Sequence, residues 1–253
     1  MTIVPTASAQ RRVIDELTTI TAPVGPALRF SFVALEPRTA LSTVAALTMR
    51  ELRRGRAGRI LSVDTRLGQS GRAVLLEGSP LSDETFVRIP EGTREWMRER
   101  GGLVAVSFDH GGVADWNRVI APVVRHFDIV GTDWGALAQD DASIAARTGH
   151  VVCITGTWER DSAESAIAFA RAIHDQTDEC RPIVVLSDVT RTRSTWPRLV
   201  TRHVPVRVLA VPHDRLLAAG GPASPPTTTR ARMVAAALRA AADGRAPSHG
   251  ELR

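Results

Sequence analysis

Two aspartates close apolar runs of the sequence, where a carboxylate is placed to do chemistry. Asp64 ends the run Ile60–Asp64, and Asp133 ends the run Asp128–Asp133. If these runs are buried strands, each carboxylate needs a partner, because an unpaired buried charge is costly. In a functional site that partner is a ligand or a metal ion. The alternative is that each aspartate only caps the turn or helix that follows it.

The basic side chains of this sequence are of one kind. All 32 are arginines, and the chain contains no lysine. A planar guanidinium does not replace the compact ammonium that reaches the β- and γ-phosphates in a phosphate-binding loop. Lysine-dependent phosphate chemistry and Schiff-base formation are therefore excluded. An arginine-only composition is also what a GC-rich genome would give.

Composition sets few other limits. The net charge of +5 permits weak attraction to nucleic acid or anionic lipid without requiring it. Cys153 and Cys180 lack metal-binding spacing, so we expect reduced thiols in a cytoplasmic protein. The N-terminus lacks the basic start and apolar run of a signal peptide, and no apolar run approaches the length of a membrane span.

Short apolar runs alternate with amphipathic segments from Leu28 onward. Such runs are typical of strands buried on both faces, and the alternation predicts a doubly wound α/β fold, with a mainly parallel sheet and helices on both faces. The expected strands are Phe30–Leu35, Ile60–Asp64, Leu103–Phe108, Asp128–Asp133, Val151–Thr155, Ile183–Ser187 and Val206–Val211. The expected helices are Ala40–Arg54, Asp115–His126, Asp140–Ala146, Ser162–Gln176, Trp196–Thr201 and Thr229–Ala242.

The predicted domain organisation is simple. Residues 1–27 are expected to be an N-terminal extension with a helix over Gln10–Ile20, and residues 28–253 one α/β domain. Turn-forming residues predict loops at Leu81–Gly92 and Gly220–Thr228, the second serving as a stiff connector to the last helix.

Ligands in such sheets bind outside the carboxyl ends of the strands. There, the first strand runs into the eight-residue loop 36–43 and then a helix, which resembles the deviant Walker A loop of the MinD/ParA family of P-loop ATPases (SIMIBI class). Ser42 and Thr43 keep the hydroxyls that reach Mg²⁺ and a phosphate in that family. Glu36 stands where the family has its signature lysine, and Leu41 stands where it has its phosphate-binding lysine. The family's three glycines are replaced by Pro37, Arg38 and Ala40.

Later segments resemble the same family in order, over about residues 28–243. Asp64 resembles the aspartate near the metal and attacking water, and Asp133 resembles the Walker B aspartate. Ser187 or Asp188 stands where the family often has an adenine-reading asparagine, and Asp214 lies in a turn after the last strand. The resemblance implies Mg²⁺ held by Ser42, Asp64 and Asp133, and a nucleotide contacted by Arg38, Ser42, Thr43, Asp64, Asp133, Asp188 and Asp214.

The departures from the family loop remove its phosphate chemistry. Glycines let backbone N–H groups close around a phosphate at positive φ, and Pro37 lacks an N–H altogether. Glu36 brings a negative charge, and Leu41 removes the cation. We therefore expect no ordinary ATP hydrolysis and no required cofactor, with weak binding of ATP or ADP with Mg²⁺ as the alternative.

The resulting expectation is a pseudo-ATPase that acts as a scaffold or regulator. It would dimerise across the face of loop 36–43, with itself or with a related ATPase or secretion component, in secretion or cell-pole and partitioning machinery. Two alternatives stay open: a weak Mg-nucleotide-binding ATPase with a lysine-free loop, and a DNA-associated partitioning-type protein. The last would use two arginine clusters, Arg50, Arg53, Arg54, Arg56 and Arg59, and Arg191, Arg193, Arg198 and Arg202.

The arginine clusters and the last expected helix both have structural explanations that need no DNA and no membrane. Cations near helix C-termini are favourable without any ligand, so nucleic acid is disfavoured as a partner. The last expected helix, Thr229–Ala242, lacks large apolar residues, which favours packing on the domain over peripheral membrane contact.

A competing constellation is Asp109-His-Gly-Gly112, which resembles the oxyanion loop of esterases. An esterase also needs a Gly-x-Ser-x-Gly elbow, and the nearest match, residues 68–71, lacks that spacing. Asp109, His110 and Asp133 are a weak candidate metal set. A dinucleotide-binding loop is excluded because residues 36–43 contain no glycine.

Overall fold

A computed structural model describes residues 6–25, 27–65, 79–80, 97–100, 102–107, 112–177, 179–191 and 205–244. Within them a nine-stranded sheet has the order β3-β4-β5-β2-β6-β1-β7-β8-β9. Its pairs are parallel except β3–β4 and β4–β5. The strands are β1 Leu28–Ala34, β2 Ile60–Asp64, β3 Ser79–Pro80, β4 Met97–Arg100, β5 Leu103–Ser107, β6 Ile129–Ala136, β7 Val151–Thr157, β8 Arg181–Ser187 and β9 Arg207–Val211.

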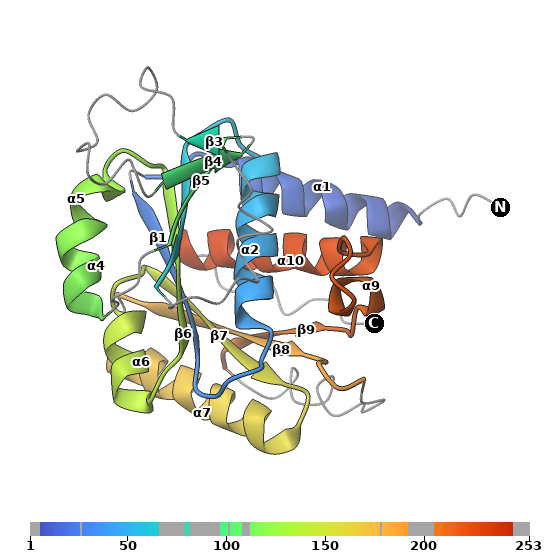
Figure 1. Cartoon of the computed structure of the whole chain (residues 1–253). Coiled ribbons are helices and arrows are strands. Elements are labelled where there is room, and N and C mark those ends of the chain that lie inside the picture. The colour runs from blue at the N-terminus through green and yellow to red at the C-terminus, as the bar shows by residue number, and fades with distance from the viewer. Residues whose placement is uncertain are drawn as a thin grey trace.

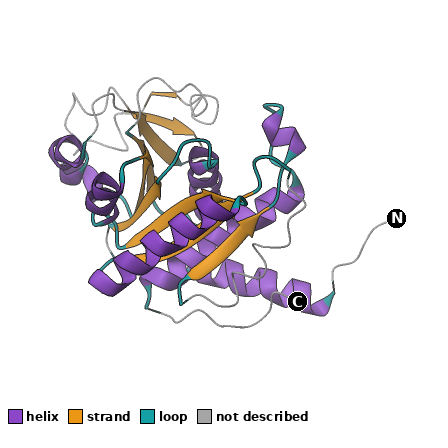
Figure 2. Ribbon diagram, turned by 90° about the horizontal axis from the view of Figure 1, so that it is seen from below, coloured by secondary structure: helices purple, strands orange, loops and turns teal. Residues whose placement is uncertain are grey.

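Helices cover both faces of this sheet (Figure 1 and Figure 2). Successive strand residues point to opposite faces, so each face has its own apolar core. Phe30 and Phe32 of β1 pack toward α2 and α10, whereas Leu61 and Val63 of β2 belong to the core of the opposite face. The helices are α1 Ala7–Thr21, α2 Leu41–Arg54, α4 Val113–Val119, α5 Ala121–Val124, α6 Gln139–Ala146, α7 Arg160–Gln176, α9 Arg215–Ala218 and α10 Pro225–Ala242. The predicted doubly wound α/β fold is confirmed.

Helix α2 lies close against β6. The Gly131 position on β6 makes this approach possible, because a Cβ there would lie 2.4 Å from the sulfur of Met49. Met49 is fully buried in the core beneath α2. Because α2 follows the end of β1 through a short loop, its start lies at the carboxyl-end edge of the parallel strands, where the predicted site residues lie.

The single helix predicted over Asp115–His126 is wrong. The chain forms α4 and α5 instead, with a break at Ile120. Pro122 explains the break, because it lacks the N–H for an intrahelical hydrogen bond and its ring clashes with the preceding turn.

The loop predicted over Gly220–Thr228 is too long. Helix α10 begins at Pro225, with Ser224 at its N-cap position. Proline is favoured in the first helical turn, where its missing N–H would have no intrahelical partner anyway. The helix predicted at Trp196–Thr201 and the loop predicted at Leu81–Gly92 lie outside the described residues.

Helix α1 of the N-terminal segment packs along α10 (Figure 1). Ile20 is fully buried in the core under α2 and α10. Arg56 donates to the carbonyl of Ile20 at 2.9 Å, and Arg239 donates to the carbonyl of Pro23 at 3.1 Å. Residues of the domain therefore hold the end of α1 and the segment that leads to β1.

Candidate functional site

The loop between β1 and α2 has left-handed turns without any glycine. Arg38 has φ +64° and Ala40 has φ +60°. Side chains with a Cβ are disfavoured in this region by roughly 1–2 kcal/mol. Thr39, between them, is buried, and its hydroxyl lies 2.8 Å from the hydroxyl of Thr155 near the end of β7. The backbone therefore follows a path that suits glycine, at two of the three positions where the resembled family has one.

The side chains of this loop do not suit a phosphate. Leu41 is 5% exposed and packs in the apolar core with Phe32 and Val44. Pro37 and Arg38 are exposed at the apex of the loop. Glu36 lines a polar cavity of about 470 Å³, and its buried Oε1 has no hydrogen-bond partner within the described part of the chain. The remaining lining of this cavity comes from Leu35, Gln139, Thr155, Ser162, Ser165, Ala166, Ala168 and Phe169.

Asp64 and Asp133 lie side by side on neighbouring strands. They are register partners in the parallel pair β2–β6, and their side chains are 4% and 0% exposed. Adjacent strands are about 4.8 Å apart, and paired residues point to the same face, here the face covered by α2. Two adjacent buried carboxylates are the kind of oxygen donors that a divalent cation takes. Ser42, the second residue of α2, follows the loop on this same face.

The prediction that Asp133 closes its strand is wrong, since β6 continues to Ala136. Gly135, at φ +80°, bends the strand so that its N–H donates to Asp133 Oδ1 at 2.9 Å. Thr65 donates from both its N–H and its hydroxyl to the Asp133 carbonyl, each at 3.1 Å. The Asp133 backbone and carboxylate thus fix the local turn, and the carboxylate also stands beside Asp64.

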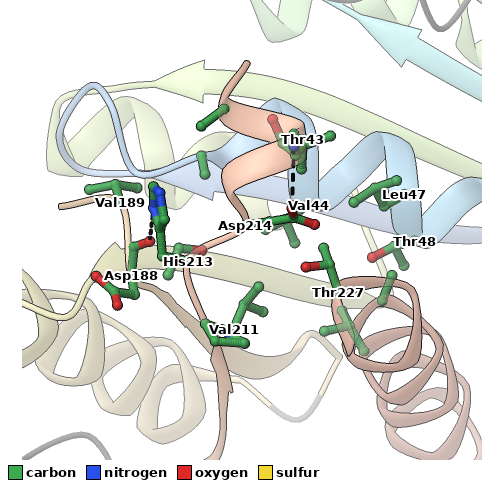
Figure 3. A pocket seen from close by; sticks show the side chains of 17 residues that line it. Thr43, Val44, Leu47, Thr48, Asp188, Val189, Val211, His213, Asp214 and Thr227 are labelled. Atoms are coloured by element: carbon green, nitrogen blue, oxygen red, sulfur yellow. Dashed lines mark hydrogen bonds between the residues drawn. The ribbon is translucent and has the colours of Figure 1, made fainter. Parts of the chain in front are cut away.

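A second cavity of about 230 Å³ lies between α2, α10 and the segments after β8 and β9 (Figure 3). Thr43, Asp188 and Asp214, which sequence reasoning proposed as site residues, all line it. Arg38 does not line it. The other lining residues are Ala40, Val44, Leu47, Thr48, Ser187, Val189, Val211, Pro212, His213, Leu217, Ala218, Thr227, Ala231 and Val234.

Two buried hydroxyls in this cavity lack a hydrogen-bond partner among the described residues. They are Thr48 Oγ1 and Ser187 Oγ, on side chains that are 0% and 3% exposed. Sequence reasoning missed Thr48. The sequence did hold a signal for it: Thr48 follows Val44 by four residues, so both lie on the apolar face of α2, where a hydroxyl would be buried.

Asp214 is the N-cap of α9. Its Oδ1 accepts hydrogen bonds from the N–H groups of Leu216 at 3.0 Å and Leu217 at 3.2 Å, and Oδ2 accepts from Ser224 N–H at 2.8 Å. Burial by itself would raise the pKa of this carboxyl. Hydrogen bonds from Thr227, Ser224 and Leu217 outweigh that effect and hold its pKa well below the usual range. Capping is therefore the role that the contacts of Asp214 support.

Asp188 follows β8 and is joined to the last strand through its backbone. Its N–H donates to the Val211 carbonyl at 2.9 Å, and its carbonyl lies 3.2 Å from His213 Nδ1 (Figure 3). Because a carbonyl can only accept, the imidazole donates from Nδ1. Sequence reasoning missed His213 as a residue of this cavity.

The first arginine cluster makes contacts within the chain. Arg53 donates to the carbonyl of Arg56, Arg54 pairs with Glu51 at 2.6 Å, and Arg56 holds the end of α1. Arg193, Arg198 and Arg202 of the second cluster lie outside the described residues, as do Asp109, His110 and residues 68–71. No described helix has the length and apolar character that a membrane crossing needs.

No family model and no curated protein matches the sequence, but solved structures match the fold. MinD from Pyrococcus horikoshii OT3, complexed with Mg-ADP, has a TM-score of 0.64 at 14% identity, over 89% of this chain and 99% of that chain. The cell division ATPase MinD of Pyrococcus furiosus has a TM-score of 0.63 at 16% identity, over 86% and 99% of the two chains. A ParA family ATPase from Chlorobium tepidum TLS has a TM-score of 0.55 at 16% identity, over 88% and 97%. The chain therefore has the fold of the MinD and ParA P-loop ATPases.

Proposed function

We propose that the protein is a pseudo-ATPase of the MinD/ParA type, a non-catalytic scaffold or regulator that works by dimerising. The observation that carries the proposal is the burial of Leu41 in the apolar core at the start of α2. A leucine packed there supplies no charge to a polyphosphate. Glu36 adds a negative charge to the same loop, and Pro37 removes one N–H that could face an anion.

The fold around this loop is otherwise kept, which supports a role that uses its surface. The left-handed turns at Arg38 and Ala40 and the buried hydrogen bond of Thr39 maintain the loop's shape. Left-handed turns at residues other than glycine cost free energy. In a loop that does not bind phosphate, we infer that this cost is kept because another molecule recognises the shape of the loop. A partner protein that packs on it is the use we propose.

The proposed interface is the face formed by loop 36–43 and the ends of β2 and β6. Glu36, which is half-buried, would attract a cationic side chain of the partner to this loop. The partner is a second copy, a related ATPase or a secretion component, and the setting is secretion or cell-pole and partitioning machinery. Light scattering on the purified chain, alone and with candidate partners, tests dimerisation. Glu36→Gln should weaken the dimer, whereas Glu179→Gln, on an exposed residue, should not.

A restored loop gives the complementary test. The variant with Glu36→Lys, Pro37→Gly, Arg38→Gly, Ala40→Gly and Leu41→Lys returns the cations and the glycines together. It should gain Mg²⁺-dependent affinity for ATP and ADP that the parent chain lacks. If the parent binds and hydrolyses ATP as well as the restored variant does, the loop is not the cause of inactivity and the proposal fails.

A second candidate is weak binding of a Mg-nucleotide, which the adjacent Asp64 and Asp133 favour. Mg²⁺, if bound, would be held by these two carboxylates with Ser42 and would neutralise phosphate charge. Thermal stability with ADP separates the candidates, because ligand at about 100 times its Kd stabilises by roughly 2.7 kcal/mol. A Mg²⁺-dependent shift would support this candidate, and no shift at millimolar ADP would support the scaffold. No contact in the described part of the chain favours the DNA-associated alternative, since Arg53, Arg54 and Arg56 are engaged within the chain.

A further inference from the structure

A polar cavity of about 470 Å³ lies beside loop 36–43, among the segments that follow three adjacent strands. Strand β1 lies between β6 and β7 in the sheet, so the loop after β1 is flanked at the carboxyl edge by the starts of α6 and α7 (Figure 1). Glu36 from the loop, Gln139 from α6 and Ser165 from α7 are among the lining residues. One water molecule takes about 30 Å³ of the liquid, so the cavity has room for a side chain of another molecule.

Negative charge gathers around this cavity. Glu36 is half-buried in its lining. Four exposed carboxylates adjoin the lining at the starts of the two helices, those of Asp140, Asp141, Glu159 and Asp161. Arg160 lies among them but is paired with Glu164 at 2.7 Å. Carboxylates that gather at a cavity attract a cation to it.

Arg38 carries a positive charge at the apex of the same loop. It is exposed and has φ +64°. Only Pro37 separates it from Glu36, yet the two side chains do not pair with each other, and neither has an ion pair or hydrogen bond within the described part of the chain. The two members of a two-fold interface present the same surface to each other. An acid and a base that stay unpaired in one loop can therefore pair across such an interface, each with its opposite in the other copy.

We propose that the chain forms a two-fold dimer in which Arg38 of each copy enters the polar cavity of the other copy and pairs there with Glu36. This contact rests on the dimerisation that the proposed function assumes, and it gives that dimer its charged pairs. A guanidinium donates five N–H bonds in a planar fork that suits carboxylate oxygens, and Gln139 and Ser165 offer further acceptors in the cavity. Two such contacts form in each dimer, and they would offset the cost of the left-handed turn at Arg38.

Charge reversal tests the contact, with dimerisation followed by light scattering over a concentration series. Arg38→Glu alone places two carboxylates at each contact, and Glu36→Arg alone places two guanidinium groups there. Each variant should therefore dimerise at least about tenfold more weakly than the parent chain. In an equal mixture of the two variants, both contacts of the heterodimer join opposite charges again. The mixture should therefore dimerise within about threefold of the parent.

Matched controls separate this contact from the effect of net charge. Arg12→Glu in α1 and Glu179→Arg after α7 make the same charge changes at exposed positions outside the loop and the cavity lining, and they should leave the dimer affinity unchanged. A mixture that stays as weak as its two components would overturn the reciprocal contact. Unchanged dimerisation in both single variants would overturn it too, although the dimer of the proposed function would remain. A parent chain that is monomeric throughout would overturn the contact and leave the proposed function only a different partner.

Neutral variants cover the case in which Glu36→Arg does not fold, which its melting curve would reveal. Arg38→Gln and Glu36→Gln should each weaken the dimer about three- to tenfold, and the doubly substituted chain should be no weaker than either, because both changes remove the same pair. Additive losses would overturn the pairing. Calorimetry with agmatine, a small guanidinium compound, tests a free ligand in the same cavity. Binding that needs Glu36, together with a dimer that neither variant changes, would assign the cavity to a small cation and overturn the contact with a second copy.

Discussion

Replacing Ala40 by glycine should stabilise this protein, although the same change inside a helix destabilises. Ala40 is the N-cap residue of α2, with φ +60° and ψ +21°, in the left-handed region. Its Cβ costs roughly 1–2 kcal/mol there. Glycine removes that cost. It also gives the unfolded chain more conformational freedom, which lowers the stability of the folded state by about 0.4–1 kcal/mol. The expected gain in the free energy of unfolding is therefore about 0.5–1 kcal/mol.

Thermal and denaturant unfolding measure this effect. For a chain of this size the gain corresponds to a rise of about 1–4 °C in melting temperature. Ala46→Gly is the matched control, because Ala46 lies within α2 and the same change should cost about 1 kcal/mol. If Ala40→Gly and Ala46→Gly destabilise equally, the loop lacks the left-handed turn and the inference from its shape is refuted.

Three further predictions concern charge and burial. Asp214→Asn should lower the melting temperature at pH 7. Because the folded-state pKa of Asp214 is depressed, its stabilisation is fully present above the unfolded pKa of about 4 and falls progressively as the pH drops below that value toward the folded-state pKa. The difference between the two melting temperatures should therefore be constant above about pH 5 and smaller at about pH 3 than at pH 7. A difference at about pH 3 as large as the one at pH 7 would contradict the pKa direction. Arg239→Leu should cost about 1–3 kcal/mol in urea unfolding, because Arg239 is 1% exposed and bonded to Asp243 and to the Pro23 carbonyl. Arg160→Leu, in an exposed ion pair, should cost less than about 0.5 kcal/mol, and equal losses would show that burial is not the cause. Burial raises the pKa of both thiols, that of Cys180 to about 12, so Cys153 and Cys180 should react with a thiol reagent at pH 8 only as fast as the chain unfolds; prompt labelling would contradict their burial.

The sheet and its order of elements could be predicted because apolar runs carry that information directly. Strands such as Val151–Thr157 are buried along their whole length, so their sequence is apolar on both faces. The position of Asp64 at the end of β2 followed from the same pattern, whereas β6 continues past Asp133 to Ala136. Helix breaks were missed where Pro122 interrupts an otherwise suitable run.

The site could be predicted only in part. Arg38 and Ala40 give no hint of a left-handed turn, because neither residue type favours it and the tertiary structure imposes it. Thr48 resembles any helical threonine until its missing hydrogen bond is seen. Asp214 was predicted as a nucleotide contact from the resemblance; its sequence position did not reveal that it caps α9 through Leu216 and Leu217 and accepts a third backbone hydrogen bond from Ser224.

Phosphate release from ATP by the purified chain, compared with that by Asp64→Ala, tests the central claim most directly. With Leu41 buried at the start of α2 and Glu36 in the loop, we expect no release above the protein-free rate and no difference between the two proteins, with or without Mg²⁺. Mg²⁺-dependent release that disappears in Asp64→Ala would show that the loop supports catalysis without a cation, and the pseudo-ATPase account would be wrong.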